Sequence, residues 1–156
     1  SLEKKNLELV VETPDEPLWV NAHATNVEIV LSNLLSNAIK FTDPGGEIRV
    51  ESRPSETDSV LTCVSDTGSG ISETSLPHIF ERFRQGDGST RRRHPGTGLG
   101  LAIVKKILDS YNCSIEVNSQ PGEGTTFCFA LPAAGREMQP EALLAAERGI
   151  EHGRGE

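Results

Sequence analysis

The sequence lacks two features that would place it at a membrane or on a nucleic acid. No run of residues is long and apolar enough to cross a bilayer, and no secretory leader is visible, so we expect no direct membrane contact by this chain. Basic residues are outnumbered, with 15 Lys and Arg against 23 Asp and Glu. The resulting net charge of −8 disfavours a general nucleic-acid surface. We therefore expect a cytoplasmic domain, or one on the cytoplasmic side of a membrane-anchored protein.

Cysteine is also scarce. The three cysteines, Cys63, Cys113 and Cys128, are scattered and lie in or beside apolar runs. Their spacing is not that of a metal site. An odd number of dispersed cysteines is typical of a cytosolic protein, so we predict that all three are reduced, buried thiols.

The composition that remains fits one globular domain. A chain of 156 residues with 35% hydrophobic and 24% charged residues is long enough to bury a proper core. Beyond Pro132 the composition changes to Ala, Glu, Gly and Arg without aromatics, although residues 141–148 could form a weak helix. We predict a domain over residues 1–132 and a flexible tail or linker over residues 133–156.

Hydrophobic periodicity predicts two longer helices and several strands. The first helix is expected from a capping box at residues 25–28 to about Phe41, and the second from a glycine-rich stretch to about Ser110. A short helix, interrupted or restarted at a proline, is expected within residues 72–83. Strands are predicted at residues 7–12, 18–20, 47–53, 60–65, 114–119 and 125–131, with the last two joined as a hairpin.

Two amides and a lysine fall together on the first predicted helix. At about 100° per residue, Asn33, Asn37 and Lys40 lie at the edge of the apolar stripe that contains Leu34 and Ala38. Two interpretations stay open. The strip is a solvated flank, or its amide oxygens bind a hard cation such as Mg²⁺ while Lys40 reaches a phosphate.

A carboxylate beside two glycines follows the strand predicted at residues 60–65. Asp66 precedes Gly68 and Gly70, and could accept the exocyclic amine of a purine that lies against the bare backbone. The alternative is a turn in which Asp66 caps its own backbone.

Three alternating glycines, Gly96, Gly98 and Gly100, open the second predicted helix. Bare backbone and unpaired N–H groups at a helix start make a seat for phosphate, although a plain helix-entry turn would have the same pattern. The preceding residues 84–95 are basic and glycine-rich in an otherwise acidic chain. A solvated charged face is one interpretation, and a lid over polyphosphate is the one that the adjacent seat favours.

These motifs stand in an order that resembles one family. An asparagine-bearing helix, a strand ending in Asp66-Thr67-Gly68-Ser69-Gly70, a phenylalanine segment at residues 79–83, a basic loop and the glycine-rich helix start follow one another. The chain resembles, over residues 7–132, the ATP-binding catalytic domain of bacterial sensor histidine kinases, in the superfamily of gyrase, Hsp90, histidine kinases and MutL. The resemblance implies a Bergerat-type α+β fold, a two-layer sandwich of a mixed, mostly antiparallel sheet with helices on one face.

The resemblance also implies roles for individual residues. Asn37 is expected to ligate Mg²⁺, Lys40 to contact phosphate, Asn33 to support either contact, and Asp66 to read adenine. Some family members have arginine where Gln85 stands, so the phosphate role passes to Arg84 or Arg91. The other residues expected at the nucleotide are Gly68, Gly70, Ile71, Phe83, Arg84, Arg91, Gly96, Thr97, Gly98, Leu99, Gly100, Leu101 and Thr126.

The reaction implied is phosphoryl transfer rather than hydrolysis. Superfamily members that hydrolyse ATP carry a glutamate where this chain has Asn33, and an amide cannot accept a proton from water. The resemblance therefore implies a protein-histidine kinase that binds Mg·ATP and donates the γ-phosphoryl group to a histidine on a separate dimerisation domain. The sequence holds no His-Glu acceptor helix, and its four histidines are expected at the surface: His23, His78, His94 and His152.

Partners follow from the same resemblance. They are the protein's own histidine-bearing dimerisation domain and a response regulator receiver domain, within a full-length homodimer. The sequence of residues 83–87 resembles that of hybrid sensor kinases more closely. At a turn where family members often have His-Gly-Gly, this chain has Tyr111-Asn112-Cys113. Two alternatives stay open: a non-catalytic, ATP-responsive interaction module, and a hydrolase of the gyrase or Hsp90 type.

Overall fold

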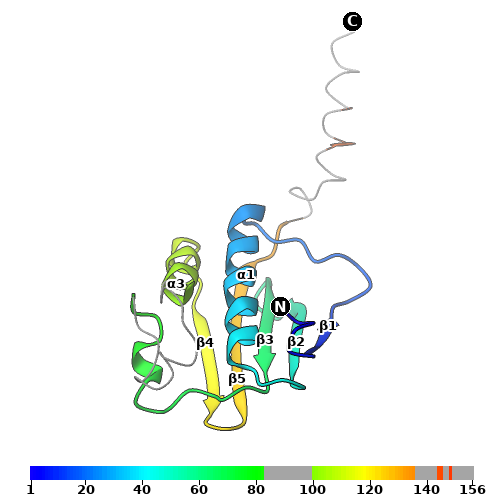
Figure 1. The fold of residues 1–156 in the computed structure, drawn as a ribbon. Coiled ribbons are helices and arrows are strands. Elements are labelled where there is room, and N and C mark those ends of the chain that lie inside the picture. The colour runs from blue at the N-terminus through cyan, green and yellow to red at the C-terminus, as the bar shows by residue number, and fades with distance from the viewer. Residues whose placement is uncertain (83–99, 136–143, 146–147, 149–156) are drawn as a thin grey trace, which may run out of the picture.

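The computed structural model describes residues 1–82, 100–135, 144–145 and 148 (Figure 1). Within these residues, no helix has the length and apolar character needed to span a membrane. The predicted tail at 133–156 lies mostly outside them. In chain order the elements are β1 (Glu8–Glu12), α1 (Ala24–Phe41), β2 (Glu47–Ser55), β3 (Ser59–Asp66), the 3₁₀-helix η1 (Leu76–His78), α3 (Gly100–Ser110), β4 (Ile115–Gln120) and β5 (Gly124–Pro132).

The strands form one five-stranded sheet in the order β1-β2-β3-β5-β4. The pair β1–β2 is parallel, and the other three pairs are antiparallel. Both α1 and α3 lie on the same face of the sheet (Figure 1). The predicted α+β, two-layer sandwich with a mixed, mostly antiparallel sheet is therefore confirmed.

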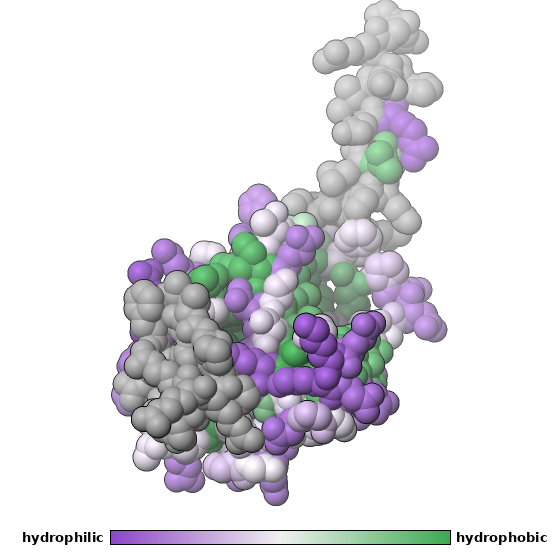
Figure 2. All heavy atoms as spheres, viewed as in Figure 1, coloured by the Kyte–Doolittle hydropathy of each residue, from purple (hydrophilic) through white to green (hydrophobic). Residues whose placement is uncertain are grey.

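The core lies between the two helices and the central strands. Alternate residues of β3 and β5 are buried, as a half-covered sheet requires, so Val64 and Phe127 point towards the helices. Burial of apolar surface is the main favourable contribution to folding, at about 25 cal/mol per Å². On the helix-bearing face, hydrophobic and hydrophilic residues lie side by side at the surface (Figure 2). The core cluster comprises Val30, Leu34, Ala38, Ile48, Val64, Val104, Leu108, Phe127, Phe129 and Leu131.

Helix α1 begins earlier than the sequence predicted. His23 is the N-cap residue, with φ −69° and ψ 132°, and no side chain caps the helix. The predicted capping box is therefore wrong, because Thr25 already lies within the first turn. Tyr111, from the turn after α3, ties this end of α1 instead: its hydroxyl accepts hydrogen bonds from the His23 backbone N–H at 3.0 Å and the Asn26 amide at 2.9 Å.

The other end of α1 is held by a lysine from the segment before β1. The Lys5 ammonium donates hydrogen bonds to the carbonyl oxygens of Ile39, Lys40 and Thr42, at 2.8, 3.1 and 3.1 Å. These carbonyls belong to the last turn of α1, where backbone acceptors lack helical partners and the dipole favours a cation.

We expect Lys5→Met to lower the free energy of unfolding by about 1–2 kcal/mol, because it leaves these carbonyls unpaired while keeping the apolar stem. Chemical denaturation measures the loss. The matched control is Lys4→Met, since Lys4 is exposed and its charge is the same. Equal losses in the two variants would contradict a role for the Lys5 contacts.

Two shorter elements differ from the prediction. The strand predicted at residues 18–20 is absent, because only Val20 pairs, in an isolated bridge with Ala133. Within residues 72–82 the only helix is η1, one 3₁₀ turn with Pro77 near its start. Both segments are too short and too rich in proline or polar residues to sustain a ladder or an α-helix.

The prediction of three reduced, buried thiols is wrong. Cys63 and Cys128 are joined in a disulfide with a Cα–Cα distance of 4.1 Å, and both are half-buried. They lie 65 residues apart in sequence, and only the register of β3 and β5 brings them together. Cys113 is a free, half-buried thiol, and burial raises its pKa.

Candidate nucleotide site

Three segments meet at one side of α1: its C-terminal half, the loop after β3, and the start of α3. A Cβ placed on Gly100 would lie 3.0 Å from the Asn33 side-chain oxygen, so the first residue of α3 abuts α1 there. The loop after β3 reaches the last turn of α1, where Ser69 N–H donates to the Phe41 carbonyl at 3.1 Å. A Cβ on Gly68 would lie only 2.4 Å from the same carbonyl oxygen. Only glycine permits this approach.

The asparagine edge of α1 lies between these two contacts. Asn33, Asn37 and Lys40 are all half-buried, as the helical spacing predicted. The Asn33 amide donates to the Ile29 carbonyl at 2.8 Å, which leaves its oxygen near Gly100. The Lys40 ammonium lies 5.5 Å from the centre of the Phe41 ring.

The residue types along this edge fit a magnesium site in which waters and phosphate oxygens supply most of the metal ligands. Among the described residues, no group of three or more His, Cys, Asp or Glu could hold a metal ion. Mg²⁺ bound with nucleotide takes few protein ligands and keeps waters and phosphate oxygens. The Asn37 amide oxygen is a hard donor of the required type, and no described side chain hydrogen-bonds to it.

Asp66 lies at the end of β3, half-buried, at the base of the loop. Its Oδ1 accepts a hydrogen bond from Gly68 N–H at 2.8 Å, so the turn considered as an alternative for this residue is present. Burial raises the pKa of the carboxyl, against the opposing effect of backbone hydrogen bonds from Gly68 and Thr125. A hydrogen bond between this half-buried carboxylate and a ligand would be screened less by water than one at an exposed carboxylate.

The β4–β5 hairpin supports this loop from below. Gly122 N–H donates to the Ser69 carbonyl at 2.7 Å. Gly70 has φ +72°, and a Cβ there would lie 2.2 Å from the Gln120 carbonyl oxygen. Gly124, at the start of β5, would place a Cβ 2.0 Å from the Asp66 carbonyl oxygen. The backbone of the hairpin therefore packs directly on the backbone of the loop after β3. This contact fixes the position of the loop.

Ser119 is a contact that sequence reasoning missed. Its hydroxyl accepts a hydrogen bond from Ile71 N–H at 2.7 Å and donates to the Gly124 carbonyl at 3.0 Å. It also lies 2.8 Å from the hydroxyl of Thr125, the residue paired with Asp66. One serine thus joins the loop, the hairpin and the strand beside Asp66. No motif marks it, because a serine near a strand end is common.

We expect Ser119→Ala to weaken ATP binding about fivefold, close to the 1 kcal/mol of a typical hydrogen bond, since the Ile71 N–H loses its acceptor. Calorimetric titration with ATP measures the affinity. Ser119→Thr keeps the hydroxyl and should restore it, and the control Asn118→Ala changes an exposed neighbour on the opposite face. Equal affinities for Ser119→Ala and the control would contradict this role.

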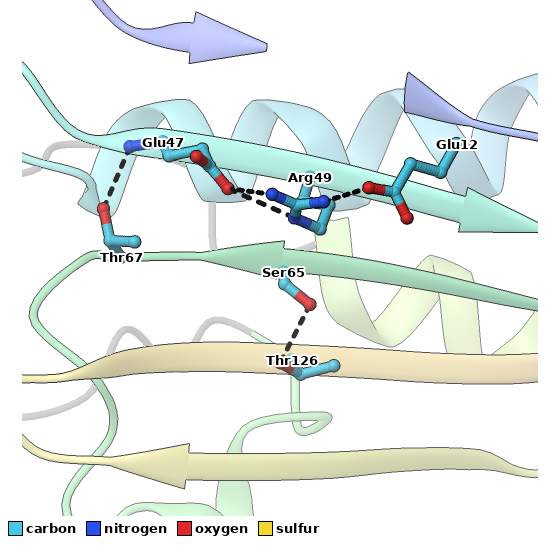
Figure 3. A network of polar contacts seen from close by, with 6 residues as sticks. All are labelled: Glu12, Glu47, Arg49, Ser65, Thr67 and Thr126. Carbon is cyan, nitrogen blue, oxygen red and sulfur yellow. Dashed lines mark hydrogen bonds and ion pairs between the residues drawn. The ribbon is translucent and has the colours of Figure 1, made fainter. Parts of the chain in front are cut away.

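Thr126, expected at the nucleotide, lies on the other face of the sheet. Its hydroxyl donates to Ser65 at 3.0 Å, on the side away from the helices (Figure 3). The residue opposite Asp66 is Thr125, which is 6% exposed and faces the helices. Counting the strand alternation from Phe127, a clear core residue, would have selected Thr125 from the sequence.

The same outer face carries two ion pairs formed by residues of β1 and β2, and a hydrogen bond to the loop after β3 (Figure 3). The Arg49 guanidinium lies between the carboxylates of Glu47 and Glu12, and forms an ion pair with each. The Thr67 hydroxyl accepts a hydrogen bond from Glu47 N–H at 3.0 Å. This last bond attaches the loop after β3 to the start of β2.

The remaining predicted residues fall into two groups. Ile71 and Leu101 are half-buried and pack against the core cluster, and Gly100 begins α3. In the phenylalanine segment, the Phe80 ring meets Phe127 edge-on, with centroids 6.4 Å apart. The residues that lie outside the described part of the chain are Phe83, Arg84, Arg91, Gly96, Thr97, Gly98 and Leu99.

Comparison with known sequences and structures agrees with this arrangement. "Autoinducer 2 sensor kinase/phosphatase LuxQ" of Vibrio parahaemolyticus is 38% identical over 152 residues, which is 94% of this chain and 18% of that protein. "Sensor protein SrrB" of Staphylococcus aureus is 43% identical over 103 residues, which is 66% of this chain and 18% of that protein. The chain therefore spans less than a fifth of the length of these relatives.

Solved structures give the same result. "Mycobacterial sensor histidine kinase MprB" superposes with a TM-score of 0.73 at 28% identity, covering 85% of this chain and 88% of that one. Full-length ShkA, solved in complex with AMPPNP, has a TM-score of 0.73 at 29% identity, covering 85% of this chain and 27% of that one. The sequence also matches, over residues 22–135, the family described as "Histidine kinase-, DNA gyrase B-, and HSP90-like ATPase". That match runs from the start of α1 through the end of β5, so the chain belongs to this family.

Proposed function

We propose that this chain binds Mg·ATP and donates the γ-phosphoryl group to a histidine on a separate dimerisation domain, as the catalytic domain of a two-component sensor kinase. The observation that carries the proposal is the convergence of the asparagine edge of α1, the Asp66 loop and the start of α3. One element supplies amides and a lysine, the second a half-buried carboxylate, and the third a helix N-terminus. These are the groups that a metal-bound adenine nucleotide requires.

Adenine recognition falls to the Asp66 loop. The carboxylate accepts the exocyclic amine of adenine, a donor that guanine lacks at that position. Gly68 and Gly70 keep the neighbouring backbone bare, so that a flat base can approach it. Asp66 is half-buried, so its hydrogen bond to the base forms in a site that is partly shielded from water.

Phosphate binding falls to α1 and α3. Asn37 would hold Mg²⁺, which when bound neutralises charge on the phosphate oxygens. Lys40 contributes a mobile cation from the last turn of α1, and Asn33 lies where α1 meets the first residue of α3. The N-terminus of α3 adds N–H groups that have no partner within the helix, and the positive end of its dipole. Arg84 and Arg91 are proposed as further phosphate contacts.

The same residues argue for transfer over hydrolysis. Asn33 stands where hydrolytic relatives carry a general base, and its amide donates to the Ile29 carbonyl. An amide held in this way cannot take a proton from water. The chain's contribution is positioning and charge neutralisation of the γ-phosphoryl group, which is the main requirement of this reaction.

Partners follow from this assignment. The acceptor histidine would lie on the protein's own dimerisation domain, within a homodimer, and a response regulator receiver domain would take the phosphoryl group onward. A cytoplasmic position accords with both.

The proposal is tested by supplying the matching dimerisation domain and labelled ATP. We expect an acid-labile, base-stable phosphoimidazole on the added domain, formed in proportion to the amount of this chain. Tight ATP binding without transfer would instead make the chain an ATP-responsive module. Steady release of phosphate by this chain alone would make it a hydrolase.

We expect Asn37→Ala to weaken Mg·ATP binding about tenfold, or about 1.4 kcal/mol, and to leave binding of metal-free ATP nearly unchanged. The reason is that the variant removes a metal ligand without adding charge. Titration with and without magnesium separates the two. Ser36→Ala, at an exposed position of the same helix, is the matched control. A similar loss with and without magnesium would rule out Asn37 as the ligand.

A further inference from the structure

The Cys63–Cys128 disulfide lies on the face of the sheet opposite to the helices. On β3 the neighbours Thr62 and Val64 point into the core, and on β5 so does Phe127. Strand alternation therefore turns both cysteines outwards. Both are half-buried, and neither described helix covers this face (Figure 1). Among the described residues, this face therefore leaves part of each cysteine open to solvent.

The register of the sheet places acidic residues on either side of the pair. Glu51 lies opposite Cys63 on β2, and Glu116 lies opposite Cys128 on β4. The attacking thiolate carries one negative charge when the thiol bears no other charged group, and more when it also bears carboxylates, so these glutamates repel an acidic thiol more strongly. The flanking residues thus favour exchange with neutral low-molecular-weight thiols.

The pair can open without unfolding the sheet. β3 and β5 are paired over eight rungs, from Ser59–Pro132 to Asp66–Thr125, and the disulfide occupies one of them. Their backbone hydrogen bonds and the core residues Val64 and Phe127 remain when the sulfur atoms separate. Both redox states are therefore folded states of the same sheet.

The same ladder connects the disulfide to the candidate site. Along β3 and β5, the Cys63–Cys128 rung is followed by Val64–Phe127, Ser65–Thr126 and Asp66–Thr125. The Asp66 carboxyl is hydrogen-bonded by the backbone N–H of Thr125, so its position depends on the separation of the two strands. The ladder keeps the mean separation in both redox states, and a covalent link three rungs away narrows its fluctuations.

We propose that Cys63 and Cys128 form a redox-modification site, at which exchange with low-molecular-weight thiols controls adenine-nucleotide affinity. In the reductive step, a small thiol loses its proton and attacks one sulfur atom to form a mixed disulfide. The other cysteine leaves as a thiolate and takes up a proton. A second thiol resolves the mixed disulfide. The two cysteines gain two electrons and two protons, and two small thiols become one small disulfide. The control of affinity rests on the function proposed above.

The oxidised form binds nucleotide more tightly. The disulfide holds Asp66 and Thr125 in place before the base arrives, so less conformational entropy is lost on binding. Reduction releases this constraint. We expect ATP affinity about fivefold weaker in the reduced form, at the lower end of the coupling usually found between two sites.

The experiment titrates ATP into the same protein, oxidised and after reduction with dithiothreitol, which is uncharged. Thiol counting with an aromatic disulfide reagent in denaturant should give one thiol before reduction and three after it. Reoxidation with 2-hydroxyethyl disulfide, an uncharged linear disulfide, should restore the affinity. Cys63→Ser and Cys128→Ser should bind as the reduced protein does, with or without dithiothreitol. Cys113→Ser should respond as the wild type does.

Each result is decisive. Equal ATP affinity of the two forms would overturn the coupling, and three free thiols in the protein exposed to 2-hydroxyethyl disulfide would overturn the redox site itself. Failure of both forms to bind ATP would overturn the proposed function, and this control with it. If a serine variant does not fold, the wild-type comparison before and after reduction still decides the matter.

Discussion

Asp66→Asn is expected to weaken ATP binding about 5- to 150-fold, which corresponds to about 1–3 kcal/mol. The side chain keeps its shape and keeps an oxygen for the Gly68 N–H, which donates at 2.8 Å. Its amide group, however, presents a donor where the adenine amine needs an acceptor. Two donors then face each other in a half-buried site. Calorimetric titration with ATP measures the loss.

The pH dependence of the wild type provides a second test. The pKa of Asp66 is raised, chiefly by burial, so the carboxylate is protonated at a higher pH than an ordinary aspartate. A protonated carboxyl is a poorer acceptor for the adenine amine. Wild-type affinity should therefore fall on acidification before the exposed carboxylates titrate, and Asp66→Asn should lack this component.

The stability of the variant separates a binding effect from a folding effect. A carboxyl with a raised folded pKa stabilises the fold below that pKa, and this contribution is lost as the pH rises through it. At neutral pH the ionised Asp66 therefore carries a desolvation cost that asparagine does not. We expect no loss of unfolding free energy from this source. Unchanged ATP affinity in a folded Asp66→Asn would place adenine elsewhere.

Much of the fold was predictable because the sheet is half-covered. Alternation of apolar residues located β3 and β5 to within a residue or two, and the stripe around Leu34 located α1. Two of the misses have a common cause, since each depends on a partner distant in sequence. The start of α1 is tied by Tyr111, and Cys63 meets Cys128 only through the β3–β5 register.

The residue types of the candidate site could be predicted from the sequence. The contacts that hold these residues in place were harder to predict. Helical spacing placed Asn33, Asn37 and Lys40 on one half-buried edge. Nothing in the local sequence shows that Gly100 abuts Asn33, or that Ser119 accepts the Ile71 N–H. These contacts follow from the packing of α3 on α1 and of the hairpin on the loop, and no local residue pattern predicts them.

Gly70→Ala is expected to cost about 2–5 kcal/mol of unfolding free energy, the sum of a left-handed backbone penalty and an overpacking penalty. Gly70 has φ +72°, and its added Cβ would lie 2.2 Å from the Gln120 carbonyl oxygen and 2.9 Å from the Pro121 Cα. Both atoms belong to backbone, which cannot turn aside as a side chain does. The β4–β5 hairpin would have to move away from the loop.

Gly122→Ala separates these two penalties. Gly122 has a similar φ of +80°, but a Cβ there meets nothing within 4 Å. It should therefore cost only the backbone penalty, about 1–2 kcal/mol. Denaturant unfolding of both variants, followed by ATP titration of the folded fraction, measures the difference.

We expect Gly70→Ala to lose ATP affinity as well, because a displaced hairpin breaks the Gly122–Ser69 and Ser119–Ile71 hydrogen bonds that hold the loop beside Asp66. Equal costs for the two alanines would mean that the hairpin does not support the loop, and adenine recognition would then depend on Asp66 without the scaffold beneath it.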